Sequence, residues 1–152
     1  MDSTTQSLGF LLADAARLVR RNFDERARSI GVTGPQWRVL TALVHHEGIY
    51  QSRLADLIEV EPISLCRMVD RLQESALVER RPSPSDRRAW QLFLTEKART
   101  LVAQLREPAY ETLSEALEGL NEAERQQLAA ALERIRLNLS RKPAVSDGAS
   151  NG

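Results

Sequence analysis

Apolar and polar positions alternate along most of the chain with the period of an α-helix. From Ser7 to Ile30, leucine, alanine and valine recur every three or four residues, and charged residues fill most of the positions between them. This pattern predicts one long amphipathic helix that Gly31 ends. An apolar stripe so narrow over so many turns suits packing against another long helix, for example one of a second subunit.

Three shorter helices are predicted next. Thr33 to Gln36 supplies an N-cap, a first-turn proline and a capping partner, and opens a helix that ends near Gly48. A third helix is expected over residues 51–58, and Pro62 opens a fourth. Four apolar residues of the fourth helix share one face: Leu65, Met68, Val69 and Leu72.

The pattern changes after the fourth helix. Leu77-Val78 and Trp90 to Leu94 are predicted as short strands around a loop of prolines, serines and arginines. Two helices joined by a short turn and followed by a hairpin are the outline of a winged helix-turn-helix. After Thr95, a predicted N-cap, a helical pattern resumes, and Pro108 should kink or break it.

A last helix and a tail complete the chain. Asn121 to Glu124 is a second capping box, which opens the last predicted helix. From Pro143 onward the residues are mostly small or polar, so we expect residues 143–152 to form a disordered tail.

Charge narrows the location of any nucleic-acid contact. Twenty-one basic residues balance twenty-one acidic ones, so DNA affinity would have to come from a local cluster. The hairpin segment 80–88 has a local excess of positive charge. It carries one acid, Asp86, and four arginines: Arg80, Arg81, Arg87 and Arg88. Two prolines stiffen this loop, and an arginine on a stiff loop suits a narrow minor groove.

The fourth predicted helix carries a complementary set of polar side chains. Ser64, Arg67 and Arg71 lie away from its apolar face. A hydroxyl and two guanidinium groups in this arrangement suit base edges and phosphates of the major groove. The helix and hairpin together predict a DNA-binding module.

Specific stretches resemble a known family. They are TGPQWRVL at 33–40, RMVDRL at 67–72 running into ALVER at 76–80, and DRRAWQLFLT at 86–95. In these stretches the chain resembles the MarR family of winged helix-turn-helix transcription regulators, whose wing signature is Asp-x-Arg followed by Leu-x-Leu-Thr. Ala76 and Ala98 stand where the family often has glycine, which leaves the local geometry there open.

The resemblance implies a fold and a way of working. The fold class is mainly α with a small β-hairpin: a winged helix-turn-helix DNA-binding domain over 33–95 and a helical dimerisation region of 7–30 and 96–141. The expected order is helix, helix, strand, helix, helix, strand, wing, strand, helix, helix. The implied function is a homodimeric repressor that binds a pseudo-palindromic operator in double-stranded DNA and is released by a small phenolic or lipophilic anion.

The resemblance also assigns candidate residues. Arg88 would enter the minor groove, oriented by an ion pair with Asp86. The candidate DNA contacts are Ser64, Arg67, Arg71, Asp86, Arg87 and Arg88. A ligand cleft would be lined by Arg17, Thr33 and Trp37, as a cation, a hydroxyl and an aromatic wall. The alternative is that Trp37 is only a core residue and Arg17 only a surface residue.

Three alternatives concern redox sensing, metal binding and catalysis. Cys66, the single cysteine, excludes an internal disulfide framework, and its place near a helix N-terminus beside Arg67 suggests a redox-sensing alternative. His45 and His46 diverge by about 100° on a helix, so no metal site is expected. No catalytic constellation is recognisable, so neither an enzyme nor a cofactor is expected.

Two further expectations concern partners and location. A winged-helix adaptor that binds proteins instead of DNA remains an alternative, because a fold does not fix a function. No apolar stretch approaches the length of a membrane span, and we expect a cytoplasmic protein without a membrane partner.

Overall fold

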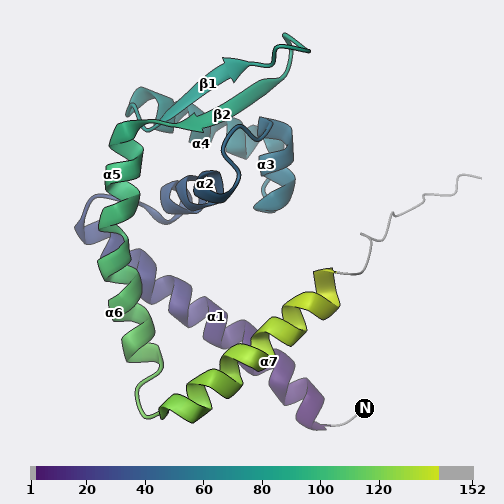
Figure 1. The fold of residues 1–152 in the computed structure, drawn as a ribbon, viewed down its shortest axis with the longest axis vertical. Helices are drawn as coiled ribbons and strands as arrows, with labels where there is room; N and C mark the ends of the chain where they lie inside the picture. The colour runs from purple at the N-terminus through teal and green to yellow at the C-terminus, as the bar shows by residue number, and fades with distance from the viewer. Residues whose placement is uncertain (1–2, 141–152) are drawn as a thin grey trace, which may run out of the picture. The chain divides into compact units, whose positions relative to one another are not determined.

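A computed structural model describes residues 3–140 of the chain (Figure 1). Its elements are α1 (Ser3–Ser29), α2 (Gly34–His45), α3 (Gln51–Leu57), α4 (Pro62–Glu74), β1 (Val78–Pro82), β2 (Trp90–Leu94), α5 (Glu96–Gln104), α6 (Arg106–Ala116) and α7 (Glu122–Ser140). The predicted class, mainly α with a small β-hairpin, is confirmed. The chain divides into two compact units between Ser114 and Glu115. The expected disordered tail, 143–152, lies outside the described residues.

The central core is formed by α2, α3, α4 and the hairpin. The hairpin is antiparallel, with Val78 opposite Leu94 and Pro82 opposite Trp90. Fully buried leucines come from every layer of this core: Leu40, Leu43, Leu54, Leu65, Leu72 and Leu92. In Figure 1 the hairpin lies across α2 and α4, and the connection between its strands projects away from the helices. The module therefore buries its apolar side chains within one chain.

The apolar face predicted for α4 is the face that packs on this core. Leu65, Val69 and Leu72 are buried, and Met68 is partly buried. Pro62 occupies the first turn of the helix, where a missing N–H costs nothing. Burial on one side fixes which side chains α4 presents to solvent.

The strand expected between α2 and α3 is not formed in the described residues. Within residues 3–140 the only pairing there is an isolated bridge between Tyr50 and Gln91. Two backbone hydrogen bonds flank it, from Gly48 N–H to the Leu92 carbonyl and from Leu92 N–H to the Ile49 carbonyl. Because Tyr50 is already the N-cap of α3, the segment turns into the helix before a strand can extend.

The turn between α4 and β1 keeps a left-handed residue although no glycine is present. Ala76 has a φ of 59°. The turn closes with a 2.8 Å hydrogen bond from Leu77 N–H to the Leu72 carbonyl. The Thr95 hydroxyl donates to the Ala76 carbonyl at 2.6 Å. Left-handed backbone costs an L-residue roughly 1–2 kcal/mol, so this turn is strained where glycine would not be.

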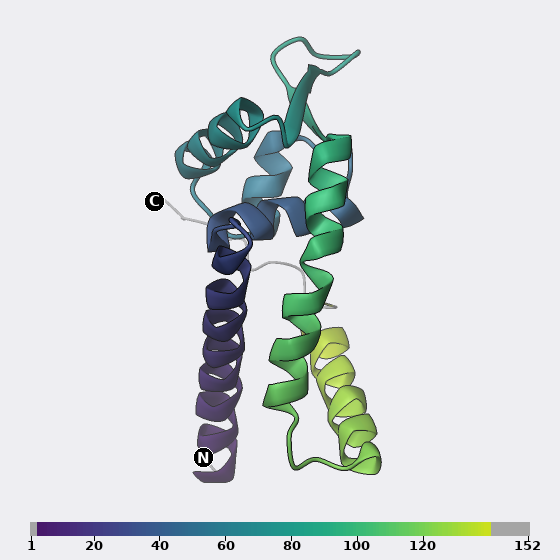
Figure 2. The same ribbon diagram turned by 90° about the vertical axis from the view of Figure 1, so that its left-hand side faces the viewer.

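A second, smaller cluster joins α1 to α5. Ala27, Val32 and Leu105 are its buried members. The Arg26 guanidinium donates to the Thr112 hydroxyl of α6 at 2.9 Å, and Figure 2 shows α1 and α6 side by side. These contacts place α1 against the helices that follow the wing.

The break between α5 and α6 agrees with the prediction from Pro108. Leu105 separates the two helices, and Pro108 is buried in the first turn of α6. A proline has no N–H, and its ring clashes with the carbonyl four residues earlier, here that of Gln104, the last residue of α5. The helical ladder therefore restarts instead of continuing.

The last helix, α7, opens with the predicted capping box. Asn121 accepts from the Glu124 N–H at 2.9 Å, and Glu124 accepts from the Asn121 N–H at 3.2 Å. None of the residues of α7 is buried. Its N-terminal cap is satisfied, but its apolar face is not covered.

Candidate nucleic-acid interface

The outer face of α4 includes four candidate side chains that point away from the core: Ile63, Ser64, Arg67 and Arg71. All four are exposed. Ser64, Arg67 and Arg71 were predicted from the sequence, and they lie together on one helix as expected. Ile63 was not included, although it is 63% exposed in the first turn of α4. The helical wheel places Ile63 on this face, but it was not predicted as a contact because its apolar side chain cannot hydrogen-bond to DNA.

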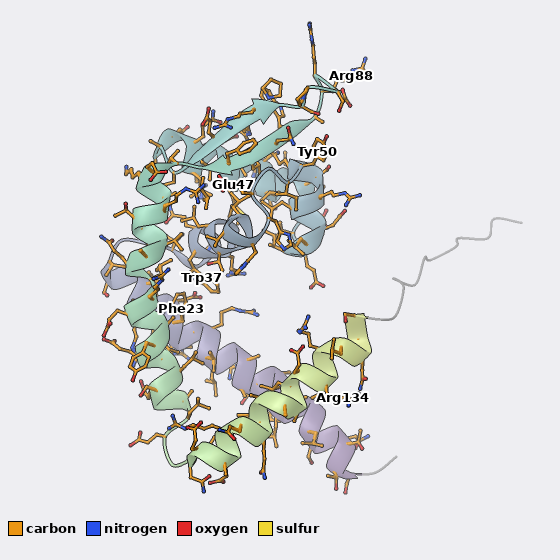
Figure 3. All side chains as sticks on the ribbon, viewed as in Figure 1. Phe23, Trp37, Glu47, Tyr50, Arg88 and Arg134 are labelled. Carbon is orange, nitrogen blue, oxygen red and sulfur yellow. The ribbon has the colours of Figure 1, made fainter. Side chains whose placement is uncertain are left out.

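The wing tip, residues 83–89, is closed by its own backbone. Ser83 N–H donates to the Ala89 carbonyl at 2.9 Å, and Ala89 N–H donates to the Asp86 carbonyl at 3.1 Å. The Asp86 carboxylate accepts the backbone N–H of Arg88 at 2.9 Å. Asp86 therefore holds the main chain of Arg88, and the implied ion pair between the two side chains is not present in the described residues. Figure 3 shows the Arg88 side chain extending away from the protein.

A hydroxyl network fixes the wing tip to the start of α3. The Tyr50 hydroxyl lies 3.1 Å from the hydroxyl of Ser83, which is 2% exposed, and the Ser83 hydroxyl lies 3.0 Å from that of Ser85. The hydrogen bond with Ser83, followed by that with Ser85, lowers the pKa of the Tyr50 phenol below 10.0. Sequence reasoning missed this network because Tyr50 and Ser83 are far apart in the chain.

The four arginines of the hairpin fall into two pairs with different surroundings. Arg80 forms an ion pair with Asp70 at 2.6 Å. Arg81 forms one with Glu79 at 3.1 Å, and its guanidinium lies 4.1 Å from the ring centre of Phe93. Neither Arg87 nor Arg88 has an ion-pair partner in the part of the chain that the structure describes. The basic excess counted for the whole hairpin is therefore concentrated at the tip.

Cys66 lies on the side of α4 that faces β1. Its sulfur is 3.8 Å from Nη2 of Arg80, and its carbonyl accepts from the same nitrogen at 3.1 Å. The thiol is partly buried. A redox role for Cys66 stays a prediction, and a Cys66→Ser variant that keeps any peroxide response of DNA binding would remove it.

Two of the three predicted ligand residues lie on one groove. Arg17 and Thr33 both line an open groove of about 690 Å³ between α1 and the start of α2. The groove is lined by Arg17, Arg20, Arg21, Asp24, Glu25, Arg28, Thr33, Gly34 and Pro35. Trp37 is not among these residues. Arginine thus predominates around the groove, which gives it a positive character.

Trp37 and Thr33 both have structural contacts near the groove. The indole N–H of Trp37 donates to Asp24, and its ring meets Phe23 edge to face with centroids 4.8 Å apart (Figure 3). Thr33 caps α2, accepting from Gln36 N–H at 3.4 Å. A Cβ at Gly34 would lie 3.0 Å from the Asp24 carboxylate, so a larger residue here would press on the group that accepts the Trp37 hydrogen bond.

Residues 3–140 lack two features that would point to other functions. No group of three or more His, Cys, Asp or Glu residues is arranged to hold a metal ion. No helix in this range has the length and apolarity to cross a membrane.

A helix-turn-helix formed by α3 and α4, followed by an antiparallel hairpin with a basic tip, defines a winged helix-turn-helix protein. A family model described as "MarR family" matches residues 30–89. A cysteine-to-serine variant of MarR from E. coli is similar over 85% of this chain and 96% of that chain, with 25% identity and a TM-score of 0.80. The chain belongs to the MarR family of transcription regulators.

Two further solved structures are similar over nearly their whole length. The transcriptional regulator PA3341 is 34% identical, with a TM-score of 0.74, over 89% of this chain and 99% of that chain. The E. coli MarR variant complexed with operator DNA is 25% identical, with a TM-score of 0.73, over 89% of this chain and 99% of that chain. The similarity therefore extends through the terminal helices as well as the winged module.

Proposed function

We propose that the protein is a sequence-specific regulator of transcription that binds double-stranded DNA. The observation that carries this proposal is the pair Arg87 and Arg88, which project from a closed wing tip without ion-pair partners in the described residues. A similar chain has been solved with operator DNA. The protein has no net charge, so these local cations would supply the electrostatic attraction to phosphate.

The outer face of α4 is proposed to enter the major groove. Arg67 and Arg71 can each present two N–H groups to guanine or to phosphate, and Ser64 can donate or accept. Asp86 holds the backbone of Arg88 at 2.9 Å, so the arginine would reach the minor groove from a fixed loop. Arg87 would lie beside it against the backbone phosphates.

We propose that the protein acts as a homodimer. On α1, Leu8, Leu11, Leu12 and Leu18 are each between 41% and 59% exposed. On α7, Leu128, Leu132, Ile135 and Leu139 are similarly uncovered. Soluble monomers rarely present large contiguous apolar surfaces. Two-fold symmetry would bring two winged modules to half-sites about one helical turn apart, so the operator should be pseudo-palindromic.

The regulator is proposed to be a repressor released by a small phenolic or lipophilic anion. The groove of about 690 Å³ has the volume of a small-molecule site. Arg17 could pair with a carboxylate or phenolate there, and the Thr33 hydroxyl could hydrogen-bond to it. At present Arg17 is paired with Asp14 at 2.7 Å, an exchangeable surface ion pair.

The DNA-binding proposal is tested by selecting sites from random double-stranded DNA and measuring variant affinities on the selected site. Arg67→Ala and Arg88→Ala should each lose about 1–3 kcal/mol of specific binding. Arg106→Ala, an exposed arginine at the start of α6, is the matched control and should bind as the parent does. Failure to enrich any sequence, or full affinity in both variants, would reject the proposal and favour a protein-binding adaptor.

The effector proposal needs a separate experiment. Aromatic and lipophilic carboxylic acids would be screened for release of the selected DNA. An active compound should require a higher concentration with Arg17→Ala, whereas Arg106→Ala should leave its potency unchanged. Equal potency in all three proteins would show that the effector, if one acts, does not use this groove.

A further inference from the structure

Arg80 lies on β1 but directs its guanidinium into the protein. Its Nε donates to Gln51 of α3 at 3.0 Å. Its Nη1 donates to Asp70 at 2.6 Å and to Gln73 at 3.0 Å, and its Nη2 donates to the Cys66 carbonyl at 3.1 Å. All three nitrogens are thus engaged, and acceptors on two helices meet at one side chain.

The Arg80 side chain is also largely removed from solvent. It is 13% exposed, whereas the carboxylate-bearing side chain of Asp70 is 52% exposed. The guanidinium is planar, with N–H groups in fixed directions, so acceptors on different elements are held in one geometry. Cys66 and Gln73 lie on a flank of α4 between its buried face and its outer face, and Asp70 lies at the edge of the outer face. Arg80 binds this flank along its length.

We propose that Arg80 is a positioning residue for DNA binding: it fixes α4 relative to the wing and neutralises Asp70, without contacting DNA itself. This inference rests on the proposed function. Arg80 belongs to the basic hairpin, but its N–H groups donate to acceptors within the winged module. The Arg88 side chain, in contrast, extends outward from the wing tip (Figure 3). The two arginines therefore have separate tasks in one wing.

Loss of Arg80 would weaken DNA binding in two ways. The flank of α4 would lose its only described attachment through a guanidinium to β1, so the helix and the wing would no longer be held at one angle. Asp70, a half-exposed carboxylate next to the outer face, would lose its counter-charge. An unpaired acid there would repel phosphates.

The first test compares arginine with lysine. Lysine keeps the charge, but its donors diverge from a single nitrogen and cannot serve acceptors on two helices. Arg80→Lys should therefore weaken operator affinity roughly tenfold, as expected for disruption of a shared network. Arg81→Lys, on the opposite face of β1, is the matched control and should bind like the parent. Parental affinity in Arg80→Lys would overturn the proposal, because a simple phosphate contact tolerates lysine.

The second test uses the salt dependence of binding. The double variant Arg80→Gln with Asp70→Asn removes both charges of the pair and leaves the net charge unchanged. Its slope of log affinity against log salt should equal that of the parent, although its affinity is lower. Arg88→Gln should reduce the slope by about one, the signature of a lost phosphate contact. A reduction of about one in the double variant would overturn the proposal.

A third variant keeps the test decisive if Arg80 variants do not fold. Gln51→Ala with Gln73→Ala removes two acceptors of Arg80 and no charge. It should weaken operator affinity several-fold with an unchanged salt slope, and parental affinity would count against the positioning role. In folded Arg80→Lys, amide hydrogen exchange should also become faster along α4, and this measurement requires no DNA. If the parent itself selects no operator, the proposed function fails, and this result is distinct from the outcomes above.

Discussion

The winged module and the terminal helices use apolar residues in opposite ways. In the module, leucines from three helices and the hairpin are fully buried. Along α1 only Ala27 is buried, and along α7 no residue is. The module completes its core within one chain, whereas each terminal helix presents leucines that only a further surface can cover. The winged module is thus complete within one chain, whereas the terminal helices carry the apolar surface that we propose forms the dimer.

The largest expected effect is a charge placed in the apolar stripe of α1. Leu11→Glu should convert the dimer to a monomer and weaken operator affinity about a hundredfold, because two linked modules gain avidity from each other. Sedimentation velocity and a DNA-binding titration measure the two effects. Ile63→Glu, at a module residue of similar exposure, should leave the assembly state unchanged. A Leu11→Glu protein that sediments as the parent does would contradict the dimer proposal.

A truncation in the module core should destabilise the fold itself. Leu65→Ala removes a fully buried side chain and should lower the free energy of unfolding by about 2–5 kcal/mol. Leu57→Ala, at a position that is 48% exposed, should stay within about 0.5 kcal/mol of the parent. Urea denaturation followed by circular dichroism measures both. If both variants lost a similar free energy of unfolding, burial would not explain the stability contribution of these two positions.

Removal of a cap should affect α7 locally. Asn121→Ala deletes the side chain that accepts from Glu124 N–H and should destabilise the first turn by about 1 kcal/mol. Because α7 buries no residue in the single chain, the change should appear as faster amide exchange in α7 while exchange in the module core stays unchanged. Faster exchange in both regions would show that the two parts unfold together.

The two alanines that stand where the family often has glycine should respond in opposite directions. Ala76 has a φ of 59°, so Ala76→Gly relieves left-handed strain and should stabilise the protein by about 0.5–1 kcal/mol. Ala98 is buried inside α5, so Ala98→Gly should destabilise it by about 1 kcal/mol. Thermal unfolding of both variants tests this, and a loss of stability in Ala76→Gly would argue against strain at the turn.

The smallest expected effect is the acid dependence of the exposed pair on β1. The hydrogen bond from Arg81 lowers the pKa of Glu79 below 4.5. A carboxyl whose folded-state pKa is depressed contributes stability above its unfolded pKa, and the contribution disappears as the pH falls through the folded value. Glu79→Gln should therefore slightly flatten the decline in stability below pH 4.5, measured by denaturation at several pH values. An unchanged pH profile would show that the pair does not affect folding.

The elements that the sequence predicted well are those that local chemistry determines. The N-caps at Thr33, Thr95 and Asn121 act within three residues, so each helix start could be found without tertiary information. The same holds for the break near Pro108, because proline blocks the ladder wherever it lies. The outer face of α4 also followed from periodicity, since burial of one side determines the other.

The features that sequence missed depend on residues far apart in the chain. Arg80 was counted with the basic wing because nothing in the sequence brings it to Gln51, 29 residues earlier. The Tyr50 network, the groove beside Thr33 and the absence of Trp37 from that groove likewise depend on tertiary packing. The extra strand before α3 was overestimated, because the pairing at Tyr50 is too short for a strand.

The closed wing tip has a consequence for the entropy of binding. The Ser83, Ala89 and Asp86 hydrogen bonds already order the loop backbone in the free protein. Association with DNA would then need to immobilise mainly the side chains of Arg87 and Arg88, at about 0.5–1.5 kcal/mol each, while the loop conformation is already selected. An Asp86→Ala protein would sample more conformations of the loop before binding. Its association with DNA should therefore be slower, which stopped-flow kinetics can measure.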